Sequence, residues 1–292
     1  MNEIGQGDLS YDDIMRRISL DDMVKQIHDL PTLPAIVMDI LNSLENEEVD
    51  IAVLAKKVAH DQALTAKTLR FANSSFYAAQ SKVTTIQQAI TLLGVQNVRN
   101  LITAAAMSGC FPENACTGFD FKAFWRHSMA VAVCAKVIAR HLRLNQDYAF
   151  VAGLLHDIGR LVLVTRFTDL YARVIAYRAE HDCYLLQAER IVMGVDHTMA
   201  GHALAVHWHF SNPIQNAIAE HHQPNAHSGS ALGSLVHVAN AVVHALDLAG
   251  VEDDLVPPLD TEAWHALGID KTVWLQIFRE TELEFGEINR VL

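Results

Sequence analysis

The sequence has few cysteines and no cysteine motif. Its 292 residues contain four cysteines, at positions 110, 116, 134 and 183, and no two of them form a Cys-x-x-Cys pair. In a chain of this size such residues are expected to be reduced, partly buried thiols. A disulfide scaffold and a cysteine-based structural zinc site are therefore not expected.

Positive charge is also scarce. Lys and Arg number 22 against 34 Asp and Glu, which gives a formal net charge of −12. Phosphate backbones attract Lys and Arg, so this balance argues against a nucleic-acid partner, although it leaves room for a local basic patch.

Targeting and membrane-spanning signals are missing too. Residues 1–9 have no basic start followed by an apolar run, so no signal peptide is predicted. Apolar stretches such as 129–138 and 151–155 are shorter than the about 20 residues that span a bilayer. We therefore expect a cytoplasmic protein with no membrane partner.

No segment shows the alternating pattern of a β-strand, whereas apolar residues recur at helical spacing along most of the chain. The sequence predicts an all-α fold with two helical lobes, including one long, strongly apolar central helix over about 146–164. The loop at 109–118 is the predicted boundary between lobes. The predicted divisions are a loose lead-in (1–18), an N-terminal helical lobe (19–115), a second helical lobe (116–250) and a C-terminal helical extension (251–292).

Histidine is the residue type in excess. Thirteen of the 16 histidines lie between His127 and His244, a stretch of 118 residues, and the other 174 residues hold three. Even placement would put about six or seven in that stretch, so the clustering requires a cause.

Some of these histidines lie in apolar surroundings, which is typical of residues that form a metal site or a buried polar cluster. The pair His156-Asp157 is flanked on both sides by core-type residues, and a buried carboxylate needs a partner. That partner is a metal ion or, in a purely structural cluster, an arginine or capping hydrogen bonds, and the residues alone leave both open. Imidazole with carboxylate suits iron, manganese or zinc. The candidate ligands are His127, His156, Asp157, His197, His221 and His222.

The order of several motifs resembles that of an HDOD domain. Leu155-His156-Asp157-Ile158-Gly159 is similar to the motif whose His and Asp ligate metal in phosphohydrolases of the HD superfamily. The other matching segments are 30–34, 61–74, 86–90 with 92–94, Gly194-Val195-Asp196-His197, Trp208, Pro213 and His221-His222. The resemblance covers about residues 20–250 and implies a two-lobed helical HDOD fold, in which the second lobe is an HD-like bundle.

The resemblance also implies a role for each candidate ligand. His127 matches the first ligand of the superfamily, and His156 and Asp157 match the central pair. The additional ligands of dinuclear members correspond to His197, His221 and His222. The implied cofactor is a divalent transition metal, iron or manganese ahead of zinc, and the resemblance leaves open whether the site is dinuclear or empty.

The chain departs from the superfamily pattern at three places. The closing ligand, normally an Asp, corresponds to Asn240, whose amide carries no negative charge. The Lys that usually follows the His-Asp motif is Arg160, which is cationic but differently shaped. His222 is followed by Gln223-Pro224 without a Gly-Tyr-Pro signature, which argues against the cyclic di-GMP phosphodiesterase branch.

Two functions follow from these observations. The favoured one is a bacterial signal-transduction or regulatory module with a protein partner in a signalling pathway, which could also form a homodimer. The alternative is a metal-dependent phosphohydrolase acting on a phosphoester or nucleotide, with Asp157 and Arg160 as its catalytic residues. The sequence leaves open whether the protein is an enzyme.

Overall fold

The computed structural model describes residues 17–30, 33, 35–42, 56, 58–59, 61–73, 83–111, 116–224, 230–250 and 255–289. Most of the predicted lead-in, and the middle of the predicted loop at 109–118, lie outside these residues. Among the described residues every regular element is a helix, which confirms the predicted all-α fold.

The described residues form a series of helices. They are α2 (Leu20–His28), α3 (Ala35–Asn42), α5 (Gln62–Ala72), α6 (Ile86–Leu93), α7 (Val95–Cys110), α8 (Phe121–His141), α9 (Gln146–Leu155), α10 (Ile158–Arg166), α11 (Thr168–His181), α12 (Leu185–Met193), α13 (His197–His207), α14 (Asn212–Glu220), α15 (Ala231–Ala245), α16 (Thr261–Ala266) and α17 (Lys271–Asn289).

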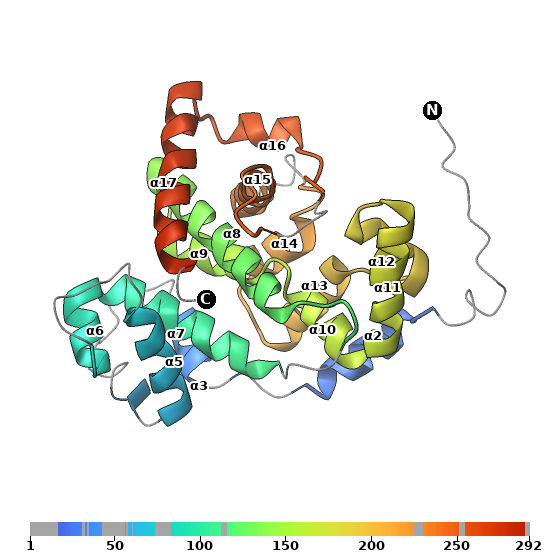
Figure 1. Ribbon diagram of the computed structural model, residues 1–292, viewed down its shortest axis with the longest axis horizontal. Coiled ribbons are helices and arrows are strands. Elements are labelled where there is room, and N and C mark those ends of the chain that lie inside the picture. Colours follow the sequence, from blue (N-terminus) through green and yellow to red (C-terminus); the bar gives the residue numbers. More distant parts are fainter. Residues whose placement is uncertain are drawn as a thin grey trace.

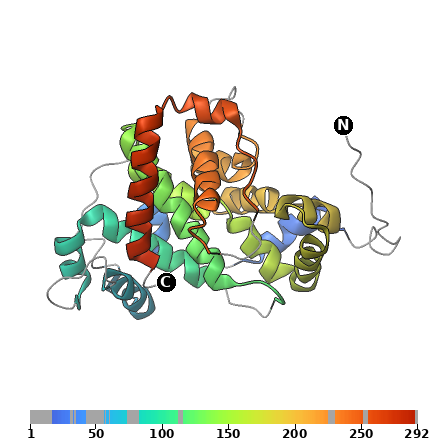
Figure 2. The same ribbon diagram turned by 45° about the horizontal axis from the view of Figure 1, so that its top comes forward.

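Helix α8 is the centre of the larger lobe, and α9, α15 and α17 pack around it (Figures 1 and 2). The carboxylate of Asp120 accepts a hydrogen bond from the backbone N–H of Ala123 at 3.0 Å, which caps the start of α8. Gly153 allows α9 to approach closely, because a Cβ at this position would lie 2.9 Å from the Cα of Ala132 in α8. The apolar faces of these helices form the main core.

The N-terminal part of the chain lies on two sides of this bundle. Helices α3, α5, α6 and α7 form a group at one side, whereas α2 packs against α13 (Figure 1). An ion pair between Arg99 in α7 and Asp147 in α9 links the group to the bundle, and both side chains are buried. The residue boundaries of the lobes stay predictions.

The predicted central helix is interrupted. Helix α9 ends at Leu155 and α10 begins at Ile158, so His156 and Asp157 form a turn between them. The backbone leaves helical geometry at Asp157, and the ring of His156 donates from Nδ1 to the carbonyl of Gly153 at 2.8 Å, at the end of α9. The stretch Gln146–Arg166 is long and apolar enough to cross a membrane, but 83% of its apolar window is buried inside the protein. It is thus a core element of the bundle.

The C-terminal helices cover one side of the bundle. Helix α17 lies along α8, where Arg140 pairs with Glu284 at 2.5 Å and His141 lies 3.3 Å from Glu280. The rings of Trp264 and Trp274 stack with centroids 4.0 Å apart, which joins α16 to α17.

Gly159 sets the closest contact between α10 and α13. A Cβ at this position would lie 1.9 Å from the carbonyl oxygen of His197 and 2.4 Å from the backbone nitrogen of Gly201. These are backbone atoms, so they cannot turn aside as a flexible side chain would. A glycine at 159 therefore brings the start of α13 next to the His156–Asp157 turn.

Substituting Gly159→Ala should lower the free energy of unfolding by about 1–3 kcal/mol or more, because the two helices must separate to admit the methyl group. Urea denaturation measures this change. The matched control is Gly286→Ala in α17, where a Cβ meets nothing within 4 Å. The control should gain about 0.5–1 kcal/mol from helix propensity. Equal stability of Gly159→Ala and the wild type would contradict the close contact.

Candidate metal centre

The His156–Asp157 turn places both side chains inside the bundle. His156 is fully buried, and Asp157 is 5% exposed. Since Nδ1 of His156 donates to a carbonyl oxygen, it carries the proton of the neutral ring, and Nε2 is left with a bare lone pair. That Nε2 lies 3.6 Å from Oδ1 of Asp157.

His197 begins α13 and faces the same carboxylate. The side chain of Asp196 caps this helix by accepting from the backbone N–H groups of Thr198 and Met199. Nε2 of His197 lies 3.4 Å from Oδ1 of Asp157. On the other side of its ring, Nδ1 lies 2.6 Å from Oε2 of Glu189, a fully buried carboxylate that also accepts from the backbone N–H of His197 at 2.9 Å.

His221 and His222 follow the last residue of α14. Nδ1 of His221 donates to the carbonyl of Ile218 at 2.9 Å, and its Nε2 lies 3.3 Å from Oδ1 of Asp157. Nε2 of His222 approaches Nε2 of His197 to 3.0 Å. His237 in α15 fixes this turn, since its Nδ1 donates to the carbonyl of His221 at 2.7 Å and its Nε2 accepts from the backbone N–H of Asp260 at 2.8 Å.

The hydrogen bonds thus leave several lone pairs pointing at one another. His156, His197 and His221 each place Nδ1 against an oxygen that can only accept, so in the neutral form each ring presents Nε2 without a proton toward Asp157. Lone pairs and a carboxylate at 3.3–3.6 Å repel unless a cation lies among them. A proton on one ring could join only one of these pairs.

The surroundings favour neutral rings at His127, His156 and His222 and an ionised carboxylate at Asp157. Burial alone would lower the pKa of His197, but the carboxylates of Glu189 and Asp157 outweigh it and raise that pKa above its ordinary value. Burial lowers the pKa of His156 to about 3, and it holds the pKa values of His127 and His222 below the ordinary range. Burial alone would raise the pKa of Asp157, but His156 and His197 outweigh it and keep that pKa well below its usual value. Neutral imidazole and ionised carboxylate are the protonation states that bind metals.

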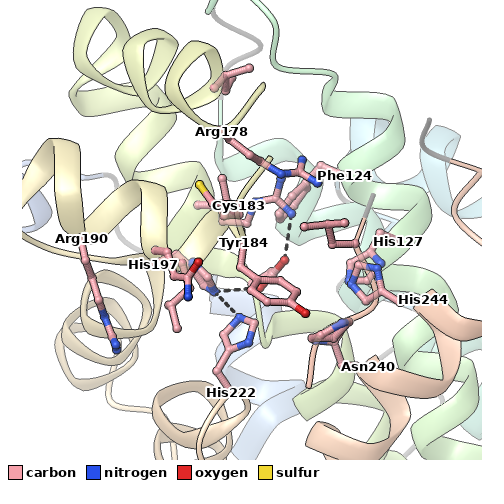
Figure 3. A pocket seen from close by; sticks show the side chains of 18 of the residues that line it. Phe124, His127, Arg178, Cys183, Tyr184, Arg190, His197, His222, Asn240 and His244 are labelled. Carbon is pink, nitrogen blue, oxygen red and sulfur yellow. Dashed lines mark hydrogen bonds and ion pairs between the residues drawn. The ribbon is translucent and has the colours of Figure 1, made fainter. Parts of the chain in front are cut away.

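The remaining predicted residues line the opposite side of the same cleft (Figure 3). His127 in α8 is buried, and its Nε2 lies 3.3 Å from Nε2 of His156. Asn240 in α15 is 3% exposed, and its Oδ1 has no hydrogen-bond partner among the described residues. Figure 3 shows these two side chains facing His197 and His222 across the cleft.

Arg160 lies beside Asp157, in the first turn of α10. Its Nη1 donates to Oδ2 of Asp157 at 3.0 Å, and its guanidinium group lies 5.7 Å from the ring centre of Phe119 and 5.6 Å from that of Phe124. The cleft has a volume of about 960 Å³ and reaches from these residues to the segment 255–260. It is large enough for a small phosphorylated molecule.

The sequence analysis missed two residues at this site. Glu189 orients His197 and is itself held by the hydroxyl of Tyr171, which donates to its Oε1 at 3.1 Å. His244, one turn beyond Asn240 in α15, places its ring 4.7 Å from that of His127. The only available signals were a Glu eight residues before His197 and a histidine four residues after Asn240.

The donor atoms of the site residues are of the kinds that bind a transition-metal ion. Two groups of side chains place ligand atoms within 4.8 Å of one another, namely Asp157, His197, His221 and His222, and His127, His156 and Asp157. All these groups are nitrogen or carboxylate oxygen donors, and three of the imidazoles are held in the metal-binding tautomer by a hydrogen bond at Nδ1.

A family pattern and one relative match this chain over most of its length. The pattern of the HDOD domain matches residues 30–224. An uncharacterized protein of Treponema pallidum (strain Nichols) is 25% identical over 229 residues, which is 76% of this chain and 44% of that protein. The uncharacterized protein YuxH of Bacillus subtilis (strain 168) is 35% identical over 75 residues, 26% of this chain and 18% of that protein. This chain thus spans less than half the length of either relative.

Solved structures resemble the whole fold. An HDOD domain protein of unknown function from Geobacter sulfurreducens has a TM-score of 0.77 and 25% identity, and the match covers 94% of this chain and 99% of that one. A proposed phosphohydrolase from Shewanella amazonensis SB2B has a TM-score of 0.72 and 26% identity, and the match covers 92% of this chain and 96% of that one.

Adding Mn²⁺ to metal-free protein should raise its thermal unfolding midpoint, because the preformed site binds the ion and the unfolded chain does not. At 100 times the dissociation constant the gain is about 2.7 kcal/mol. Scanning calorimetry measures the shift, and the double variant His156→Ala, Asp157→Ala should lose it. The control His265→Ala removes an exposed histidine and should keep the shift. An equal shift in the double variant would contradict the site.

Proposed function

The chain belongs to the HDOD domain family, and from that premise we propose that it is a regulatory module whose metal centre binds a phosphorylated ligand in the cleft. The observation that carries the proposal is the convergence of three imidazole Nε2 atoms on the carboxylate of Asp157. The structural alternative, an arginine as sole partner of the carboxylate, leaves these lone pairs uncompensated.

The proposed ligands are the residues that converge on the cleft. They are His127, His156, Asp157, His197, His221 and His222, with Asn240 as a neutral closing ligand. Mixed imidazole and carboxylate donors without cysteine suit iron, manganese or zinc, and we propose iron or manganese, as the family resemblance implies. When bound, such a metal supplies positive charge for phosphate oxygens and lowers the pKa of water at the site.

The phosphate part of the proposal rests on Arg160 and on the cleft. The guanidinium group is held by Asp157 and packed near two aromatic rings, so its position is fixed before a ligand arrives. Arginine binds phosphate oxygens through paired N–H donors. A cleft of about 960 Å³ leaves room for more than a phosphate ion, which favours a phosphoester or nucleotide.

Hydrolysis of that ligand is the second candidate function. It is supported by the position of Asp157 and Arg160 on the wall of the cleft, and by 26% identity to the proposed phosphohydrolase of Shewanella amazonensis. In this role Asp157 would hold the metal and Arg160 would neutralise charge on the phosphoryl group. The neutral Asn240 argues for the regulatory role, because it removes a negative charge that hard cations value.

The regulatory role also includes a signalling partner. We propose that the module acts in the cytoplasm through a protein partner, with a homodimer as a further possibility. Cross-linking of the tagged protein in native cells, followed by mass spectrometry, tests this part, and a specific partner should be recovered.

The manganese-loaded protein should bind phosphate compounds, and Arg160→Met should weaken that binding about tenfold or more, because a charge-assisted hydrogen bond is lost. Calorimetric titration with inorganic phosphate and with nucleoside monophosphates measures the affinity. The control Arg279→Met changes an exposed arginine in α17 and should bind like the wild type. No phosphate binding by the loaded protein would reject the proposal.

The same protein distinguishes the two functions. Release of phosphate from a panel of phosphoesters and nucleotides, abolished by Asp157→Asn, would establish the hydrolase. Metal-dependent binding without release would establish the regulatory module. Hydrolysis that persists in Asp157→Asn would point to a contaminating enzyme and count against the hydrolase.

A further inference from the structure

We propose that this centre has two unequal metal positions, and that the ion binds first among Asp157, His197, His221 and His222. These four residues are called the 197 position. The 127 position consists of His127, His156 and the shared Asp157, and fills second. This inference rests on the proposed metal centre and adds an order of affinity to it.

The two positions differ first in the kind of donors. The 197 position offers three imidazoles and a carboxylate, whereas the 127 position offers two imidazoles, the same carboxylate and the neutral amide of Asn240. A third imidazole is a better donor to a divalent transition metal than an amide oxygen, so the 197 position should have the higher affinity.

The second difference lies behind the ligands. In the 197 position, Nδ1 of His197 faces the carboxylate of Glu189 at 2.6 Å, and Nδ1 of His221 donates to a carbonyl at 2.9 Å. Glu189 is itself held at both oxygens, by Tyr171 and by the backbone of His197. A carboxylate behind a histidine fixes its orientation and increases the basicity of its Nε2.

His127 lacks such support. Its Nδ1 is buried and has no hydrogen-bond partner among the described residues. Its ring lies against the ring of His244, with centroids 4.7 Å apart, and that contact adds no negative charge. Of the two histidines in the 127 position, only His156 is held at Nδ1, by the carbonyl of Gly153.

The distribution of negative charge predicts the same order of metal binding. A divalent ion in a buried site needs negative charge nearby. Both positions share Asp157, but the 197 position also has Glu189 directly behind His197. The 127 position has Asn240, a neutral amide whose buried Oδ1 has no partner among the described residues. We therefore expect the first ion at the 197 position.

The test is a titration of the metal-free full chain with Mn²⁺, followed by isothermal calorimetry and by the electron paramagnetic resonance signal of free Mn²⁺. The wild type should bind in two steps whose dissociation constants differ about tenfold or more. His127→Ala should keep the tight step and lose the weak one, and His197→Ala should lose the tight step. Glu189→Gln should weaken the tight step by about 10–100-fold.

Asn240→Asp tests the charge argument most directly, because it adds a negative charge to the 127 position without removing a ligand. It should strengthen the weak step by at least about tenfold and leave the tight step unchanged. His265→Ala, which changes an exposed histidine, is the control and should behave like the wild type. Circular dichroism establishes that each variant is folded.

The outcomes separate this inference from the proposed function. One tightly bound Mn²⁺ ion per chain in the His127→Ala variant supports the proposed order of filling. Two equal steps in the wild type, or a tight step lost in His127→Ala and kept in His197→Ala, would overturn the order while leaving the metal centre in place. No metal binding by the folded wild type would overturn the proposed function and this inference together.

Discussion

The buried carboxylate of Asp157 is the constraint on which the rest of the site depends. It is 5% exposed, and three imidazole Nε2 atoms approach it at 3.3–3.6 Å. Carboxylates and bare lone pairs do not attract one another, so this arrangement needs positive charge. Arg160 supplies part of it from the other carboxylate oxygen. A metal ion among the nitrogens is the partner that satisfies the remaining atoms, which is why we interpret the cluster as a metal centre.

The helical bundle explains how residues far apart in sequence reach one carboxylate. The turn between α9 and α10 exposes His156 and Asp157 to the centre of the bundle. Gly159 lets the start of α13 approach that turn, and the close contact places His197 opposite Asp157. His237 ties the turn after α14 to the C-terminal segment through Asp260, so residues beyond the matched family pattern also support the site. The packing of these helices therefore determines the geometry of the site.

Much of this could be predicted from sequence, and the limits have physical reasons. Helical periodicity predicted the all-α fold, and the excess of histidine within apolar stretches predicted where the cluster forms. The break between α9 and α10 was missed, because apolar residues continue on both sides of His156 and Asp157 and neither Gly nor Pro stands at the turn itself. Glu189 was missed because its role depends on burial and on contacts across helices. The ligand roles themselves, including that of Asn240, remain predictions.

The central claim is that a metal ion lies among His156, Asp157 and His197. The most direct measurement is anomalous X-ray scattering, at the iron and manganese absorption edges, from crystals of protein purified without chelators. The account predicts an anomalous peak within coordination distance of Asp157, stronger on the side of His197 than on the side of His127. The absence of any anomalous peak near Asp157, in crystals grown with added Mn²⁺, would contradict it.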